Sequence, residues 1–518
     1  MGGLLLLAIL PVSHVLAQEP ASGDKPGASG QTPGAPGQPT TPPPIQAPVP
    51  LIPPLPDTQP VPVIPDTQLI PTLTIPSAPQ RVLPAPALRA APTARFQLEP
   101  TVAVIEEYTD NFNLSERNQK SNFRSTVAPG LGLSINEAFI KGLVLYKFAP
   151  SFDTSTDEVS LFHSLLGQVV WDVNPRWKLT LADTFTRSDQ PSEADRLGLR
   201  QQRQAFTSNT LLLASDYQIG RVATRESYQM SNFSDTGGRD TKSHTLALSA
   251  TAPFYATNSI SGGYEYLVSN STGSSVNTST TTLSASNDVD VTGHKFTAGA
   301  TRRLHTLRAV GITTSYALRT VTGGTGETDF QLWNASVFTD YELTGRLRLS
   351  SSLGVSGLTT GSGNSVGPNL STKSSLAYQF ARAVVSLAVD KGFSETFAEG
   401  ENFGVVETEG VTGSLFYPFT PSLTGAVSGS YRRNKTTGIA DVSIGNQSNQ
   451  QTENWGGTLS FSWRLRPGLL LELSYTYTRQ VGSDNDRQGV TGTTGNGSIG
   501  IDNSYTENRV KAAVNLSF

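Results

Sequence analysis

Apolar and polar side chains alternate along the last ten residues of the chain, 509–518, which read RVKAAVNLSF. In an extended strand successive side chains point to opposite faces, so one face carries Val510, Ala512, Val514, Leu516 and Phe518. A sheet that crosses a membrane cannot leave an edge open, and its last strand must therefore pair with its first. A polarised terminal strand ending on an aromatic residue is what such closure needs. An ordinary amphipathic edge strand is the alternative for this stretch alone.

Composition narrows the class of protein. The chain of 518 residues has no cysteine, a formal net charge of −4 and only 15% charged residues. No segment after the N-terminus approaches the roughly 20 apolar residues that a membrane-spanning helix needs. The lack of cysteine excludes disulfides and thiolate metal sites, and the near-neutral charge argues against nucleic acid as a partner. These properties predict an exported, β-rich protein.

The N-terminal residues 1–17 resemble a cleaved signal peptide. Residues 4–10 form a short apolar run, and Val15, Leu16 and Ala17 before Gln18 have the small-residue pattern of a cleavage site. The first basic residue is Lys25, so no positive charge precedes the run, and the natural start could lie upstream. A membrane anchor is the alternative, but the run is too short to span a bilayer.

Residues 18–95 are expected to be an unfolded periplasmic linker. Residues 20–95 hold 22 of the 33 prolines of the chain. Proline at this density removes ladder hydrogen bonds and favours the polyproline II conformation, which gives a semi-stiff tether. An arm that docks a periplasmic export partner and a segment inserted into a barrel lumen are the two alternatives.

From residue 96 onward, strand patterns repeat. In residues 469–479, Leu471, Leu473 and Tyr475 alternate with Glu472 and Ser474, and the preceding segment 455–466 alternates in the same way. Tight turns between such segments alternate with ten longer polar connections, at residues 110–121, 151–157, 188–202, 233–240, 269–292, 322–327, 360–369, 397–402, 434–451 and 482–503.

This rhythm predicts an all-β fold over residues 96–518, namely an up-and-down antiparallel transmembrane β-barrel of about 20 strands (range 18–22). The connection at residues 269–292 is long enough to hide another hairpin, which would raise the strand count by two.

Aromatic residues gather where the strands meet the short turns: Trp171, Trp177, Phe254, Tyr255, Tyr341, Tyr378, Phe416, Tyr417, Phe419, Trp463 and Phe518. Membrane barrels carry such girdles at the membrane–water interface. We therefore expect this chain in the outer membrane of a Gram-negative-type bacterium, with lipid around it. A soluble all-β fold is the alternative, although its aromatic residues would follow a buried face instead.

A local motif resembles a known family. Residues 107–114 read EYTDNFNL, residues 121–124 read SNFR, and residues 127–133 read VAPGLGL. Together they resemble the first hairpin of porin-like outer-membrane β-barrels associated with exopolysaccharide and PEP-CTERM exosortase systems. The resemblance covers this hairpin, and beyond it only the strand rhythm. Membership would imply a role in exporting or anchoring surface polysaccharide.

Two further expectations concern the strand ends. As in outer-membrane barrels generally, Val514, Leu516 and Phe518 resemble the C-terminal signal that the barrel assembly machinery reads. Asp110 and Asn111 have an interpretation from the residues alone, because Asp and Asn at a strand end bond to the local backbone and begin turns. We expect them to be structural rather than ligand-binding.

No catalytic constellation is visible. The five histidines, His14, His163, His244, His294 and His305, are scattered, and no spacing suggests a metal site, a nucleophile or a phosphate-binding loop. We expect no enzyme activity, no cofactor and no metal. A barrel hydrolase whose residues lie far apart in sequence is the alternative.

The polar faces of the strands suggest a cationic lumen. If the apolar faces contact lipid, the lumen receives the bases Lys141, Lys178, Arg225, Lys295, Arg319, Arg348, Lys373, Arg464 and Lys511, whereas only Asp172, Asp390 and Glu472 are clear acids on that face. Rings of Arg and Lys favour anions in a pore.

The sequence thus predicts a passive channel, or an export or anchoring component, for surface polysaccharide that is anionic. A general diffusion porin and a closed structural or adhesive barrel are the alternatives.

Overall fold

A computed structural model describes residues 95–518 except residues 117, 191–202, 237, 256, 273–287, 306–307, 324–325, 362–364, 397–404, 437–449 and 485–503. The expected signal peptide and, apart from Arg95, the expected Pro-rich linker lie outside the described residues. Among the residues that are described, no helix is both long enough and apolar enough to cross a membrane.

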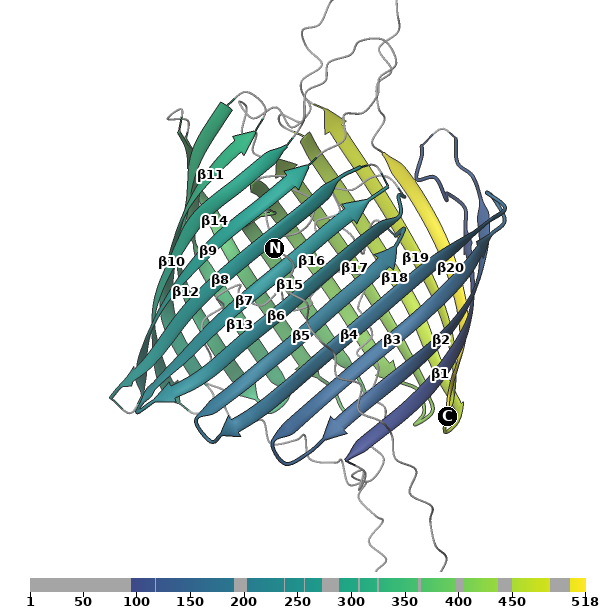
Figure 1. Cartoon of the computed structure of the whole chain (residues 1–518), viewed down its shortest axis with the longest axis horizontal. Coiled ribbons are helices and arrows are strands. Elements are labelled where there is room, and N and C mark those ends of the chain that lie inside the picture. Colours follow the sequence, from purple (N-terminus) through teal and green to yellow (C-terminus); the bar gives the residue numbers. More distant parts are fainter. Residues whose placement is uncertain are drawn as a thin grey trace, which may run out of the picture. The chain divides into compact units, whose positions relative to one another are not determined.

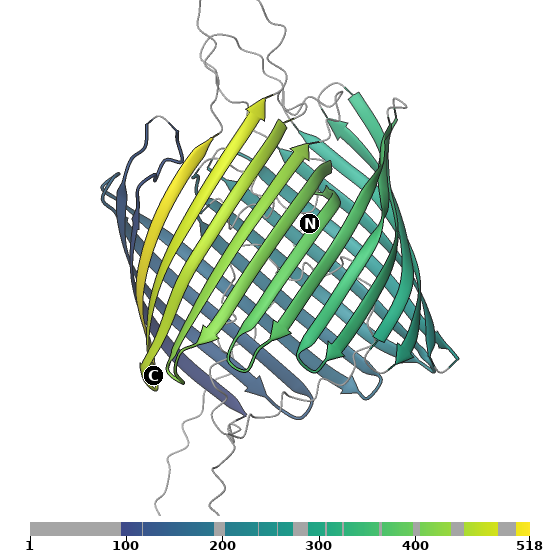
Figure 2. The ribbon, with the colours of Figure 1, turned by 180° about the vertical axis from the view of Figure 1, so that it is seen from behind.

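The described chain forms one closed antiparallel sheet of 20 strands, each paired with its neighbours in sequence (Figures 1 and 2). The strands are β1 (Phe96–Thr109), β2 (Asn122–Asn136), β3 (Ile140–Asp153), β4 (Glu158–Asn174), β5 (Trp177–Ser188), β6 (Phe206–Ile219), β7 (Val222–Asp235), β8 (Asp240–Phe254), β9 (Asn258–Thr272), β10 (Val289–His305), β11 (Arg308–Gly323), β12 (Gly326–Thr344), β13 (Leu347–Thr360), β14 (Ser365–Gln379), β15 (Val384–Glu395), β16 (Val405–Pro418), β17 (Leu423–Thr436), β18 (Gln450–Arg466), β19 (Leu469–Asp484) and β20 (Tyr505–Ser517). The predicted up-and-down barrel is therefore confirmed.

The barrel closes where the terminal strand pairs with the first. Residues 509–517 of β20 pair antiparallel with residues 101–109 of β1, and the amide of Phe518 donates to the carbonyl of Pro100 (3.1 Å). The C-terminus lies beside β1 at the end of the barrel that carries the short turns (Figure 1). Because every strand has two neighbours, no described strand is an edge strand of an open sheet.

Asp110 and Asn111 hold this junction together. The two carboxylate oxygens of Asp110 accept hydrogen bonds from the backbone amide of Asn508 (2.8 Å) and from its side chain (2.6 Å). The fully buried Asn111 side chain donates to the carbonyls of Ser115 and Thr506 (2.8 Å each). Both residues join the first loop to the last strand, which is a structural role.

The connections follow the predicted order, with one correction. β9 and β10 pair directly with each other, which agrees with the single connection expected between them and not with the alternative of another hairpin in the barrel wall. The connection expected at residues 322–327 is instead a tight turn, since β11 runs to Gly323, which pairs with Gly326 at the start of β12. β11 and β12 therefore extend further towards their connection than their apolar pattern suggested. We call the end with the longer connections the extracellular end.

The outer face of the barrel is apolar. Leu353, Val337 and Leu473, with side chains that point away from the lumen, are more than half exposed when no lipid is present. Most of the predicted girdle lies on this face at the short-turn end. Phe416 is the exception, because it and its cross-strand partner Val384 belong to the inward-facing set of their strands. A second group of outward aromatic residues lies further along the strands, about half-way or more from the short turns: Tyr146, Tyr228, Tyr264, Tyr316, Trp455 and Tyr475. Two girdles that flank an apolar band define a membrane-spanning zone.

The junction between β1 and β20 predicts the effect of Asn111→Ala. The variant removes three hydrogen bonds at a fully buried side chain and leaves two carbonyls and the Ser115 amide without these partners, which should lower the free energy of unfolding by about 1–3 kcal/mol. Urea unfolding in lipid vesicles, followed by tryptophan fluorescence, measures this. Asn113→Ala is the matched control, because its bonds within the same loop are exposed. An equal loss in both variants would contradict a special role for the junction.

Candidate functional site

Contacts between strands that are not neighbours identify the inner face of the barrel. Arg319 on β11 donates from Nη2 to Glu265 on β9 (3.0 Å) and from Nε to Glu395 on β15 (2.8 Å). β9 and β11 both flank β10, but β15 is four strands away from β11, so Arg319 and Glu395 can meet only across the lumen. The cross-strand registers then carry this orientation from Arg319 to every other strand.

All nine bases assigned to the lumen wall from the sequence share the register of Arg319. They are Lys141, Lys178, Arg225, Lys295, Arg319, Arg348, Lys373, Arg464 and Lys511. They are spread around the barrel on nine different strands rather than gathered in one place. The structure therefore gives them a common face but no common site.

Acidic side chains lie opposite most of these bases. The register sets Lys178 opposite Asp172, Arg225 opposite Asp216, Lys295 opposite Glu265, Arg348 opposite Glu342, Lys373 opposite Asp390 and Lys511 opposite Glu107. Two of these pairs are ion pairs in the structure, Lys178–Asp172 (3.8 Å) and Arg225–Asp216 (3.4 Å). The described inner wall is thus charge-paired, not cationic. The sequence interpretation had missed Glu107, Asp216, Glu265 and Glu342 on this face.

Arg319 forms the most buried of these ion clusters. Its side chain is 1% exposed, and those of Glu265 and Glu395 are 13% and 15% exposed. An apolar cluster surrounds the three charges and comprises Leu267, Val289, Val291, Val321, Phe330, Leu358 and Val405. Such a cluster inside a membrane barrel is unexpected, because the lumen of a wide barrel is normally polar.

The extracellular ends of β15 and β16 account for this cluster by lying inside the barrel. Glu395 and Val405 pair with each other and belong to the outward register of their strands, yet they contact the inward residues Arg319 and Phe330. A third contact agrees, since the inward Asn369 of β14 donates to the outward Glu407 of β16 (2.9 Å). The outer face of this hairpin end is therefore packed on the inner face of β9–β14. We call residues 392–395 and 405–408 the inserted segment.

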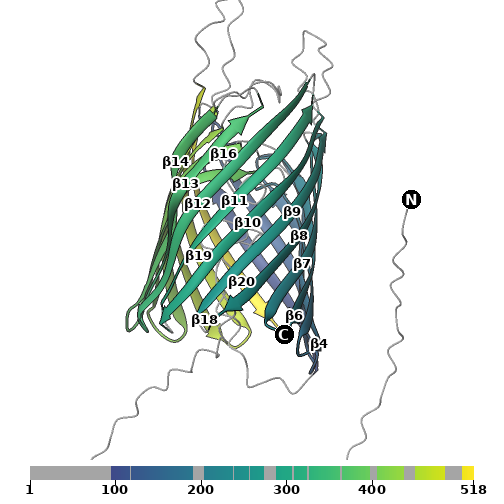
Figure 3. The ribbon, with the colours of Figure 1, turned by 90° about the vertical axis from the view of Figure 1, so that its left-hand side faces the viewer.

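The ladder between β14 and β15 explains how the inserted segment leaves the wall. These strands pair only over residues 372–379 and 384–391, so the pairing stops at the partners Thr372 and Lys391. Beyond that point β14 stays with β13, and β15 stays with β16. The barrel is broad in Figure 1 and narrow in Figure 3, which brings opposite walls within reach of one another.

A second ion cluster lies at the extracellular end near β1, β2 and β20. Arg124 on β2 donates to both oxygens of Asp153 (2.7 and 2.9 Å) and both oxygens of Asp189 (3.0 and 2.6 Å). Arg203 donates to Glu507 on β20 (2.9 Å) and lies 4.8 Å from the ring of Phe112. Asp189 follows β5, and Arg203 precedes β6. Both ends of the β5–β6 connection are thus tied to strands across the lumen.

Burial and charge set the ionisation of this cluster. Burial raises the pKa of Asp189. The hydrogen bond and the charge of Arg124 lower it by a larger amount, so the pKa lies below its ordinary value. The Arg124–Asp189 contact therefore stabilises the fold fully at pH values above the ordinary pKa of an aspartate, near 4. This stabilisation is lost only as the pH falls through the lowered pKa of Asp189. Burial also lowers the pKa of Arg203, and the charge of Glu507 offsets part of that effect.

Sequence reasoning found Arg319 but none of its partners, and it missed Arg124 and Arg203. Arg124 stands in the SNFR motif, which was identified without a role for its charge. No local pattern joins Arg319 to Glu265 or Glu395, because the three lie on different strands. Among the described residues, no group of three or more His, Cys, Asp or Glu side chains could hold a metal ion.

No family model matches the chain, and no curated protein matches its sequence. Solved structures of barrels are similar at low identity. The siderophore receptor PirA from Pseudomonas aeruginosa is 9% identical with a TM-score of 0.43, and the alignment covers 82% of this chain and 80% of that one. The FrpB iron transporter from Neisseria meningitidis is 10% identical with a TM-score of 0.45, covering 81% of each chain.

The outer membrane protein OpdK from Pseudomonas aeruginosa is 10% identical with a TM-score of 0.38, covering 82% of this chain and 99% of that one. At these identities and TM-scores, no ligand or activity of these proteins carries over. The physical argument stands on the chain itself, since a closed barrel with an apolar exterior, two aromatic girdles and a polar wall inside spans an outer membrane. The chain is an outer-membrane β-barrel.

Removing the Arg319 guanidinium should release the inserted segment. Arg319→Met leaves the carboxylates of Glu265 and Glu395 without their partner, at a cost of about 3–5 kcal/mol. Amides in residues 392–395 and 405–408 should then exchange hydrogen at least about a hundredfold faster. Hydrogen exchange with mass spectrometry measures this in lipid nanodiscs.

Arg225→Met is the matched control, because the Arg225–Asp216 pair is partly exposed and should contribute at most about 1 kcal/mol. If exchange in the inserted segment is the same in both variants, the Arg319 cluster does not hold it.

Proposed function

We propose that this barrel is a passive outer-membrane channel for a hydrophilic solute, that its specific cargo is a surface polysaccharide, and that it carries out no covalent step. The observation that supports this most is the inner wall, in which bases lie opposite acids on neighbouring strands and Ser and Thr side chains occupy several of the positions between them. Such a wall offers hydrogen bonds all round and holds no single ion strongly.

The pairing of charges bears on the kind of solute. Lys373 opposite Asp390 and Lys295 opposite Glu265 present dipoles rather than a net positive field. An anionic polymer would gain little from such a wall, whereas a neutral or weakly charged sugar chain would find donors and acceptors along its whole path. We therefore favour a weakly charged polysaccharide over the strongly anionic one expected from the sequence.

The extracellular end supports a channel that opens on demand over a general diffusion porin. The inserted segment lies in the lumen there, and Asp189 at the start of the β5–β6 connection is bound to Arg124; each of the two arginines, Arg319 and Arg124, contacts two carboxylates. A constitutive pore needs no such attachment of its own strand ends. The motif resemblance in the first hairpin supports polysaccharide as the cargo, and a periplasmic export partner would bind through residues 20–95.

Planar bilayer recording of the full chain tests the channel. We expect steady but small conductance, and a reversal potential in a KCl gradient that corresponds to an anion-to-cation permeability ratio within about threefold of one. Neutral oligosaccharides should block the current reversibly from the periplasmic side. A strong preference for either ion would contradict the paired wall, and a complete lack of conductance in every variant would favour a structural or adhesive barrel.

Opening of the lumen should follow release of the inserted segment. Arg319→Met should raise the single-channel conductance by about twofold or more, because the hairpin end leaves the lumen, while Arg225→Met should leave it unchanged. Equal conductance in the two variants, together with faster hydrogen exchange in Arg319→Met alone, would mean that the segment moves without controlling passage.

A further inference from the structure

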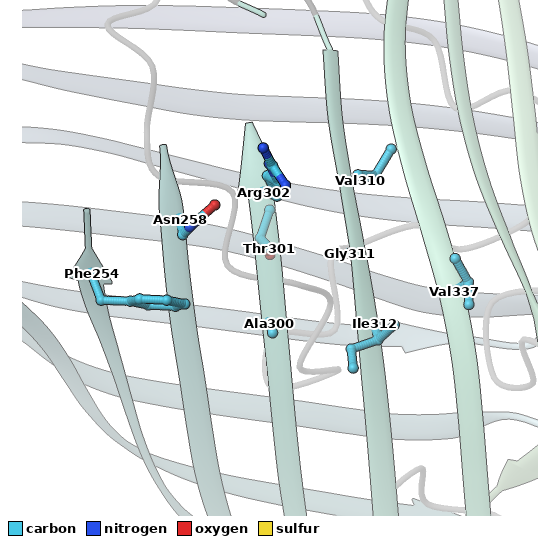
Figure 4. A pocket seen from close by; sticks show the side chains of 9 residues that line it. All are labelled: Phe254, Asn258, Ala300, Thr301, Arg302, Val310, Gly311, Ile312 and Val337. Atoms are coloured by element: carbon cyan, nitrogen blue, oxygen red, sulfur yellow. The ribbon is translucent and has the colours of Figure 1, made fainter. Parts of the chain in front are cut away.

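The outer face of β8–β12 carries a groove near the short-turn end of the barrel. Its volume is about 360 Å³, and it is lined by Phe254, Asn258, Ala300, Thr301, Arg302, Val310, Gly311, Ile312 and Val337 (Figure 4). The side chain of Ala300 is small and lies between the larger side chains of Phe254 and Ile312. The space above Ala300 forms the floor of the groove. The groove therefore follows the strand pairing diagonally from the end of β8 towards β12.

The two ends of the groove differ in chemistry. Ile312 and Val337 are directly opposite each other and form the end that lies deeper in the apolar band. Asn258 and Arg302 are also cross-strand partners, and they lie beside the short turns. The apolar groove thus ends at a guanidinium and an amide group. Both lie at the level of the girdle, where the headgroups of the inner leaflet lie.

The polar end has an unused hydrogen-bonding group. The side-chain oxygen of Asn258 is buried and has no hydrogen-bond partner. The Arg302 side chain extends next to it (Figure 4), and the described structure gives it no ion pair. A buried acceptor without a partner costs free energy unless a ligand or water satisfies it.

We propose that this groove is a binding site for one glycerophospholipid of the inner leaflet. An acyl chain lies over Ala300 and between Ile312 and Phe254, the phosphate accepts from Arg302, and the ammonium of an ethanolamine headgroup lies beside Asn258, whose buried oxygen accepts from it once the side chain turns outward. Lipid is the occupant because the groove opens onto the apolar band and ends at the girdle. A guanidinium–phosphate contact is charge-assisted and fixes the position of the headgroup. This site is independent of what passes through the lumen.

Native mass spectrometry of the full chain tests the proposal. Protein stripped of lipid by detergent exchange is given dioleoyl phosphatidylethanolamine, and the fraction that keeps one lipid is counted. Ala300→Leu fills the floor and Arg302→Gln removes the charge, so each should lower the retained fraction about tenfold. Heat-modifiable gel mobility confirms that each variant is folded.

Two controls separate this site from general lipid contact. Ala512→Leu adds the same bulk to the outward face of β20, and Arg187→Gln removes an outward charge at the extracellular end of β5. Both should retain lipid like the unmodified protein. Equal retention in all variants would overturn the proposal. So would a dimer in which Ile312→Cys forms an intermolecular disulfide, because the groove would then be an interface between two copies.

Discussion

Backbone hydrogen bonding in hydrocarbon is the constraint on which the rest of this structure depends. A strand in lipid must pair on both sides, so the chain has to bring its last strand back to its first, and residues 101–109 and 509–517 do this. Closure in turn imposes alternation, because each strand then has one face towards lipid and one towards the lumen. The Asp110 and Asn111 contacts lie at this junction, where failure to pair would open the whole wall.

The same constraint explains what happens at the shortest ladder between the described strands, that of β14 and β15. Where β14 and β15 stop pairing, the freed end of β15 stays with β16 and turns into the lumen rather than into lipid. There its apolar residues pack on the inner wall, and the Arg319 cluster compensates the charge of Glu395. The cost of burying three charges is high, and such clusters hold position more than they add stability. A segment held in this way can be released by a change at one residue, which is what a controlled opening requires.

The fold was largely predictable from the sequence, whereas the site was not. Alternation along residues 469–479 and 509–518 is a local property, and it gave the strands, the closure and the lipid-facing side. The charge of the lumen depends on which residue lies opposite which. Glu265 faces Lys295 across a 30-residue separation in sequence, and no local pattern shows that. Insertion of the β15–β16 end was even harder to predict from the sequence, because Phe393 and Val405 keep the alternation of an ordinary lipid-facing strand. Alternation reports the two faces of a strand, not what each face touches.

A single-cysteine scan along β15 tests the central claim, that alternation describes lipid outside and water inside except where the inserted segment turns into the lumen. The chain has no cysteine, so each engineered thiol is unique. A fluorophore at Val385, Leu387 and Val389 should be quenched by nitroxide-labelled lipid, and one at Ser386 and Ala388 should not. At Phe393 and Glu395, which continue the outward register, quenching should be lost. Quenching that persists at these two positions would contradict the insertion, and quenching without alternation at residues 385–389 would contradict the barrel itself.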